Sequence, residues 1–229
     1  MFACVDVDYR DAGAVAACVC FQAWSDSSSA LEAVVRIGQV EPYESGQFYR
    51  RELPCLLTVL KSLPELPEVV VIDGFVWLGR QQPGLGAHLY EALGGQVAVV
   101  GVAKSRFLRA APVEAILRGK SRSPLYISAA GRLGRSQCGA AAPGRNRPGI
   151  AADWLTTDAD TDLAEVAGHI RAMHGPYRIP TLLKRVDQLC RGLADIREEE
   201  KRDPRKPAVA IESTRPAPGR SSPAGIPPS

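Results

Sequence analysis

The sequence has few of the residues that bind transition metals: it contains three histidines, and none of its six cysteines forms a C-x-x-C pair. Structural zinc sites are built from such cysteine and histidine pairs, so the spacing predicts no zinc site. Several cysteines, including Cys4, Cys18 and Cys20, lie in apolar runs, where a reduced thiol acts as a small hydrophobic side chain. We therefore expect reduced core cysteines rather than disulfides.

Long apolar segments are also missing. No stretch reaches the roughly 18 apolar residues that span a bilayer, and the first residues, Met1-Phe2-Ala3-Cys4, do not resemble a signal peptide. The 28 Lys and Arg residues against 25 Asp and Glu residues give a net charge of +3, which permits nucleic-acid binding without indicating it. We expect a cytoplasmic monomer that makes no contact with membranes.

Apolar runs and turn signals predict an α/β fold in one domain over residues 1–195. Three sequential strands with short connections favour an antiparallel meander at the start, and apolar strands that alternate with helices after residue 50 favour parallel pairing there. The predicted strands are 2–9, 13–23, 31–39, 68–73, 96–102 and 124–129, and the predicted helices are 49–62, 85–93, 160–174 and 179–192. Since Pro54 fits only a first helical turn, the helix over 49–62 should begin near Arg51 or Glu52.

Two stretches lack the large apolar residues that packing requires. Residues 131–150 consist mainly of Gly, Ala, Arg and Pro, and residues 196–229 are charged and then rich in Pro, Ser and Gly. Neither composition buries enough surface to offset the entropy of ordering. We expect a flexible internal loop and a disordered tail; the arginines of the loop either contact phosphates or face solvent.

Three acidic residues lie at the ends of apolar elements: Asp6 in CVDVDY, Asp73 at the end of VVVID, and Glu52 after YRR. A carboxylate inside an apolar strand is costly to bury unless it is paired or binds a cation. Ligand sites in α/β sheets lie at the strand ends, and clustered oxygen ligands suit Mg²⁺ or Mn²⁺. The pattern favours a metal site, although each acid taken alone could cap a turn or face solvent.

Four blocks of this sequence resemble those of the endonuclease V family, in the same order. They are CVDVDY, PYESGQFYRRE, VVVIDG followed by GLGAHL, and VVGVAKSRF. The later segments PLYIS and GPYRIP are also similar to the family's late strand and its Gly-Tyr-Arg-x-Pro segment. The resemblance spans roughly residues 2–192 and leaves the 131–150 loop unmatched.

The resemblance implies a ribonuclease H-like mixed sheet flanked by helices. It also implies a metal-dependent endonuclease of DNA repair that hydrolyses a phosphodiester bond 3′ to a deaminated base. Matched position by position, Asp6, Glu52 and Asp73 are the catalytic acids that bind Mg²⁺ or Mn²⁺, and Lys104 neutralises charge on the scissile phosphate. The implied partner is DNA containing deoxyinosine, with inosine-containing RNA as a further candidate.

Four more residues match positions that contact nucleic acid in the family. Pro42 and Tyr43 match a wedge, which fills the gap when a base leaves the stack. Gly74 and Gly101 would let the backbone approach a base or phosphate closely. The residues alone leave other readings open, because a Tyr often closes a loop over the core and strand-end glycines are often ordinary turns.

Two segments depart from the family pattern. The family has a histidine shortly after the strand-Asp-Gly block and a His-Arg pair after the late strand, whereas residues 74–80 contain no histidine and residues 129–132 read Ala-Ala-Gly-Arg. These absences motivate two alternatives. One is a non-catalytic protein that binds inosine or damaged nucleic acid, and the other is a related metal nuclease that acts on RNA.

Overall fold

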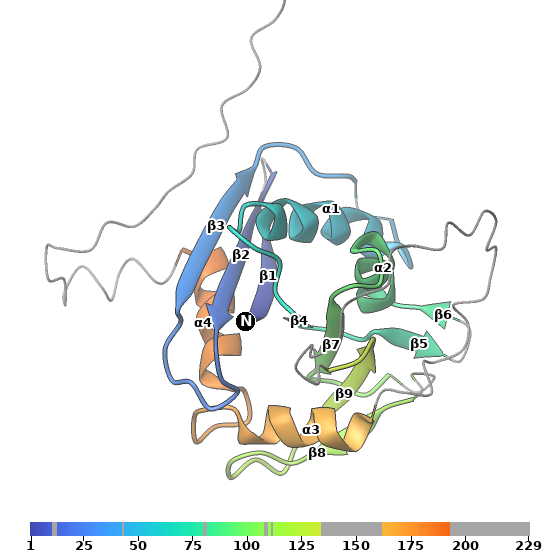
Figure 1. Ribbon diagram of the computed structural model, residues 1–229. Coiled ribbons are helices and arrows are strands. Elements are labelled where there is room, and N and C mark those ends of the chain that lie inside the picture. The colour runs from blue at the N-terminus through green and yellow to red at the C-terminus, as the bar shows by residue number, and fades with distance from the viewer. Residues whose placement is uncertain are drawn as a thin grey trace, which may run out of the picture.

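The computed structural model describes residues 1–10, 13–42, 44–79, 82–107, 110, 112–133 and 162–192. Most of the expected 131–150 loop and all of the expected 196–229 tail lie outside these ranges. Seven strands form one mixed sheet in the order β3-β2-β1-β4-β7-β9-β8 (Figure 1). Their bounds are β1 Phe2–Arg10, β2 Gly13–Phe21, β3 Leu31–Ile37, β4 Val69–Ile72, β7 Ala98–Ala103, β8 Glu114–Ile116 and β9 Leu125–Ala130.

The first three strands form the predicted antiparallel meander, with β1 paired to β2 and β2 to β3. The turn into β2 depends on Gly13, whose φ is +147° and where an added Cβ would lie 2.0 Å from the carbonyl oxygen of Ile37. Only glycine tolerates this backbone and this approach. A separate two-stranded ribbon, β5 (Trp77–Gly79) with β6 (Gln82–Pro83), follows β4 and was not predicted.

The middle of the sheet is parallel, as predicted: β1 pairs with β4 and β4 with β7. The prediction of parallel pairing was wrong for the next strand, because β9 runs antiparallel to both β7 and β8. Parallel neighbours need a long crossover, usually a helix. In the described part of the connection from β7 to β9 there is the short strand β8 and no helix, so no helical crossover brings β9 back parallel to β7.

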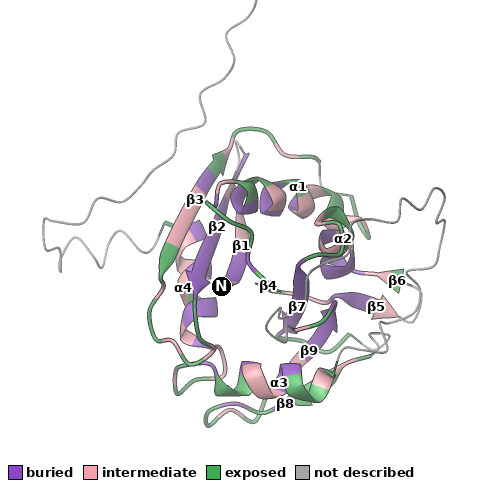
Figure 2. Ribbon diagram, in the orientation of Figure 1, coloured by how far each residue is buried: buried purple, intermediate pink, exposed green. Residues whose placement is uncertain are grey.

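Helices cover both faces of the sheet (Figure 1). α1 (Phe48–Lys61) and α2 (Leu85–Ala92) pack on one face, and α3 (Leu163–Ala172) and α4 (Thr181–Cys190) pack on the other. The central strands are buried on both faces (Figure 2), which explains their continuous apolar runs. The mixed sheet flanked by helices confirms the predicted fold class.

The predicted start of α1 was wrong, because the helix begins at Phe48 and holds Pro54 in its second turn. Pro54 has no N–H to donate to the carbonyl of Arg50. Both residues are exposed, so water can satisfy that carbonyl, and the helix continues past the proline. Glu52 therefore lies inside the helix, on its buried side, rather than at its first residue.

The five cysteines that the structure describes, Cys4, Cys18, Cys20, Cys55 and Cys190, are buried and free. The Sγ atoms of Cys18 and Cys20 are 3.8 Å apart, too far for a disulfide. The expectation of reduced core thiols is confirmed for these residues. Among the described helices, none combines the length and the apolar character that crossing a membrane requires.

Replacement of Leu60 tests the packing of α1 on the sheet. The side chain is 1% exposed, so Leu60→Ala should lower the free energy of unfolding by about 2–5 kcal/mol, through lost burial and the cavity left behind. Urea denaturation measures this change. Leu66→Ala is the matched control: Leu66 is 51% exposed, and its loss should cost under about 0.5 kcal/mol. Equal losses in the two variants would contradict the packing described.

Candidate active site

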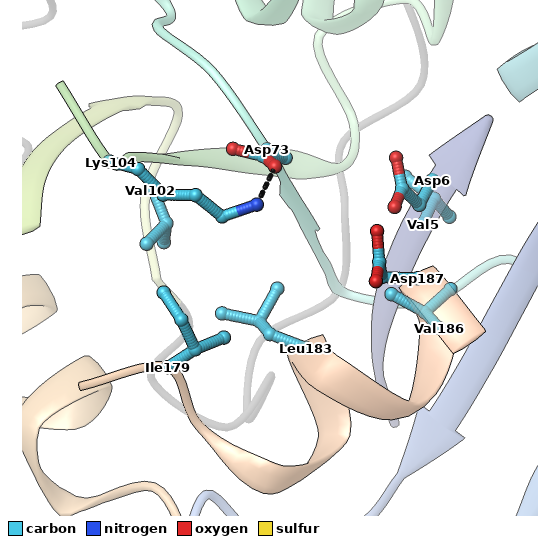
Figure 3. A pocket seen from close by; sticks show the side chains of 9 residues that line it. All are labelled: Val5, Asp6, Asp73, Val102, Lys104, Ile179, Leu183, Val186 and Asp187. Atoms are coloured by element: carbon cyan, nitrogen blue, oxygen red, sulfur yellow. Dashed lines mark hydrogen bonds and ion pairs between the residues drawn. The ribbon is translucent and has the colours of Figure 1, made fainter. Parts of the chain in front are cut away.

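Two of the predicted acids meet where β4 ends. β1 pairs with β4 up to Val5 opposite Ile72 and then continues, so Asp6 and Asp73 are the next residues on the two adjacent strands. β4 is also paired with β7, and Lys104 directly follows that strand. Figure 3 shows the three side chains directed into one small region. The parallel centre of the sheet thus brings together residues from three distant parts of the chain.

Asp73 and Lys104 form an ion pair, with Lys104 Nζ 2.5 Å from Asp73 Oδ2 (Figure 3). The two side chains are 39% and 47% exposed. Exposed pairs contribute little to stability. The pair therefore contributes little to the stability of the fold, and it leaves an ammonium group and a carboxylate accessible to a ligand.

Asp6 is more enclosed. Burial raises the pKa of its carboxyl to about 6, and the charges of Asp73 and Asp187 add to this, although the backbone N–H of Val7 donates to Asp6 Oδ1 at 2.9 Å and lowers the pKa. Lys104 lowers it slightly as well. A carboxylate in this setting favours either a proton or a cation.

Glu52 approaches from α1 and is 6% exposed. Burial, and then the charges of Asp6 and Asp73, raise the pKa of its carboxyl to about 8. The adjacent Arg51 does not neutralise it, because that guanidinium stacks on the ring of Tyr9, 3.9 Å from the ring centre. Glu52 Oε2 is buried and has no hydrogen-bond partner among the described residues. Such an orphaned buried oxygen is costly to the fold and indicates a ligand-binding role.

A fourth acid, Asp187 on α4, was not predicted. It lines the same pocket, and it contributes to the raised pKa of Asp6. Its Oδ1 accepts a bond from Arg191 at 3.0 Å. In the sequence Asp187 is next to Val186 and four residues after Leu183, at the border of the apolar stripe of α4. That position was the available signal, since a charge at such a border lies near the core.

The pocket is small and opens to solvent. Its apolar wall comes from β1, β7, α4 and the segment leading into α4, and its charges come from Asp6, Asp73, Asp187 and Lys104 (Figure 3). The lining residues are Val5, Asp6, Asp73, Val102, Lys104, Ile179, Leu183, Val186 and Asp187. Charged groups beside an apolar wall strengthen any electrostatic contact made there.

The donor set suits a hard divalent cation. The converging side chains are carboxylates, and the three histidines lie elsewhere: His88 stacks on Tyr49, His169 stacks on Trp24, and His174 bonds to Thr181. Within the described residues no three His, Cys, Asp or Glu side chains already form a coordination group. The orphaned oxygen of Glu52 and the mutual repulsion of the acids nevertheless fit Mg²⁺ or Mn²⁺, which prefer oxygen ligands.

The four predicted nucleic-acid contacts lie in different settings. Tyr43 lies outside the described residues, and its neighbour Pro42 is exposed in the segment before α1. Gly74 has a φ of +148°, and a Cβ added there would meet no atom within 4 Å, so its backbone is open to a ligand. Gly101 is buried in β7, where an added Cβ would lie 2.6 Å from the carbonyl oxygen of Gly74. Gly101 thus lets the Asp73-Gly74 turn pack closely on β7.

Comparisons with known proteins point to one family. The family model described as Endonuclease V matches residues 1–187. Endonuclease V of Streptomyces coelicolor is 30% identical over 188 residues, covering 82% of this chain and 76% of that protein. Endonuclease V of Streptomyces avermitilis is 32% identical over 191 residues, covering 82% of this chain and 77% of that protein.

Solved structures share the fold. The endonuclease V of S. avermitilis superposes with a TM-score of 0.57 at 24% identity, covering 86% of this chain and 82% of the other. Ciona intestinalis endonuclease V, solved with a 23mer DNA that contains an inosine followed by a ribo-adenosine, gives a TM-score of 0.62 at 17% identity and covers 86% of each chain. Human ENDOV gives 0.55 at 21% identity, covering 87% of this chain and 85% of the other.

The crowded acids predict how stability depends on pH when no divalent cation is present. Because the folded protein holds a proton on Glu52 that the unfolded chain has released, the free energy of unfolding should fall as pH rises from about 4.5 to about 8. Each pKa unit corresponds to about 1.4 kcal/mol, so the loss should reach a few kcal/mol. Urea denaturation in EDTA at a series of pH values measures it.

The matched variant is Glu52→Gln, which keeps the shape of the side chain and removes its titration. It should flatten the pH dependence, leaving only the smaller part that comes from Asp6. A slope as steep as that of the wild type would show that Glu52 does not carry the effect.

Proposed function

The chain belongs to the endonuclease V family and is an endonuclease, and on that premise we propose that it cuts nucleic acid 3′ to deaminated bases, in a repair role. The observation that carries the proposal is the convergence of Asp6, Glu52, Asp73 and Asp187 with Lys104 at one edge of the sheet. The DNA of the Ciona complex, which contains an inosine, supports deoxyinosine or inosine as the base. Buried free cysteines fit a reducing compartment, so we place the activity in the cytoplasm.

The acids would hold a divalent cation, Mg²⁺ first and Mn²⁺ second. Asp6 and Asp73 would be its ligands, and Asp187 and Glu52, whose charges act on the same region, would be further candidates. When bound, such a cation lowers the pKa of a water molecule and relieves charge on the phosphate. The non-catalytic alternative is not favoured, because the acids and Lys104 are all present at this edge of the sheet although the histidines are absent.

Glu52 and Lys104 would act on the reacting groups directly, Glu52 on the attacking water and Lys104 on the scissile phosphate. Glu52 Oε2 has no hydrogen-bond partner among the described residues, and it could accept a hydrogen bond from the attacking water once a bound cation favours the ionised form of its carboxyl. Lys104 is exposed and would leave Asp73 to neutralise the charge that develops on the scissile phosphate. Its flexible stem allows this change of partner.

A nicking assay tests the function. The substrate is a labelled duplex with one deoxyinosine, incubated with Mg²⁺, with Mn²⁺ or with EDTA, beside the same duplex without the lesion and a single-stranded RNA with one inosine. We expect a cation-dependent nick on the 3′ side of the deaminated base and none in the undamaged duplex. The faster of the DNA and RNA reactions identifies the strand type. No nick on either substrate with either cation would refute the proposal.

Two substitutions test the assigned roles. Asp73→Asn should abolish nicking while the protein still binds the inosine substrate, because it removes a ligand oxygen charge without changing shape. Lys104→Gln should slow single-turnover nicking by about 10²–10³-fold, and Lys104→Arg should restore part of the rate because it keeps the positive charge. Unchanged nicking by Asp73→Asn, or equal rates for the two Lys104 variants, would contradict these roles.

A further inference from the structure

Three loops meet beside the active site, outside the acidic pocket. Residues 104–107 follow β7, residues 117–124 join β8 to β9, and residues 173–180 join α3 to α4. Because β9 is antiparallel to β7, with Ala103 opposite Tyr126, the first two loops leave the sheet at the same edge. The third loop reaches this edge through Ile179, which lines the pocket with Lys104 (Figure 3).

Two arginines fix these loops to one another. Arg178 donates to the carbonyl oxygens of Lys104 and, at 2.6 Å, of Pro124, which ties the third loop to the other two. Arg118 is 5% exposed and donates to the carbonyl oxygens of Met173 and Tyr177. Arg118 is buried and Arg178 is partly buried, and guanidinium groups that donate to backbone carbonyls restrain the loops that they join. The three loops therefore form one connected surface.

The surface is strongly basic. The three loops contain six Lys and Arg residues and no Asp or Glu. Lys104 pairs with Asp73, and Arg118 and Arg178 are used in the backbone contacts. The other three, Arg106, Lys120 and Arg122, are exposed, and none of them forms an ion pair with another described residue. Their charges are available to a polyanion.

An aromatic ring lies on the same surface. Tyr177 is 70% exposed, more than any other large hydrophobic side chain that the structure describes. Its own carbonyl is held by the buried Arg118, so its backbone is fixed while its ring stays in solvent. Exposed aromatic rings among cations are the features by which proteins bind unpaired bases, since each base offers a face for stacking.

We propose that Arg106, Lys120, Arg122 and Tyr177 form a single-strand binding surface, which holds the nucleic acid next to the scissile phosphate. The three cations contact the phosphate backbone, and Tyr177 stacks on one unpaired base. A paired base in a duplex offers no free face to Tyr177, so the occupant is single-stranded. The inference deepens the proposed function and rests on it for the nature of the substrate.

The test measures binding in the cleavage-deficient Asp73→Asn full chain, in EDTA. The probe is a short fluorescent oligothymidylate, as DNA and as the RNA equivalent, titrated at several salt concentrations and followed by anisotropy. Adding Lys120→Ala and Arg122→Ala should reduce the slope of log K against log salt by about 1.4, since each single-strand phosphate contact contributes about 0.7. Tyr177→Ala should weaken binding about tenfold without changing the slope, and Tyr177→Phe should retain it.

Two controls distinguish binding at this surface from nonspecific attraction of the oligonucleotide to positive charge elsewhere on the protein. Arg36→Ala with Lys61→Ala removes two exposed cations that lie on β3 and α1, outside the three loops, and should leave the slope unchanged. Heparin is a polyanion without bases, so its affinity should fall in the Lys120 and Arg122 variant but not in Tyr177→Ala. Thermal unfolding confirms that each variant folds, and the retained binding of Tyr177→Phe shows that the ring itself acts.

Two results would overturn the inference: oligothymidylate binding by Tyr177→Ala equal to that of the Asp73→Asn parent, or equal slopes for the Lys120 and Arg122 variant and the Arg36 and Lys61 control. Neither measurement needs cleavage. Failure of the wild type to nick inosine substrates would therefore refute the proposed function without deciding this test.

Discussion

The burial of carboxyl groups beside one another is the constraint on which the rest of this structure depends. Burial, and then the charges of neighbouring acids, raise the pKa values of Asp6 on β1 and Glu52 on α1, so the fold holds these groups in place at a cost. The sheet holds Asp6 and Asp73 together against this cost, because β1 and β4 are hydrogen-bonded neighbours in its buried centre. α4 is held by Arg185, which donates two 2.9 Å bonds to Glu32 on β3.

The sequence indicated Asp6, Asp73 and Lys104 at the strand ends and Glu52 on α1, but not Asp187 on α4. Asp6 and Asp73 stand out because each interrupts an apolar run, and the pairing of β1 with β4 places them together. Asp187 looks like any other acid on an amphipathic helix, and only the packing of α4 against β1 brings it to the pocket. Strand direction was also hidden, since an apolar run has the same pattern in either direction, and β9 proved antiparallel.

The two departures from the family pattern meet in space. Trp77 lies in the segment without the expected histidine, and its Nε1 donates to the carbonyl oxygen of Ala129, in the other altered segment, at 3.3 Å. Both residues are buried. Packing between an indole and a small residue thus fills a region beside the site, and the acids and Lys104 keep their positions at the strand ends. The chain thus keeps the acids and the lysine that its resemblance to the family assigns to catalysis, although it lacks the histidines.

Charge is arranged in two zones around this edge of the sheet. The acids occupy the pocket, where a divalent cation is attracted and a phosphate alone is repelled. The three basic loops carry positive charge at the border of the pocket. Lys104 belongs to both zones, because its side chain pairs with Asp73 and its backbone carbonyl accepts a hydrogen bond from Arg178. A polyanion is therefore attracted by the border, whereas the carboxylates of the pocket repel it unless their charge is balanced.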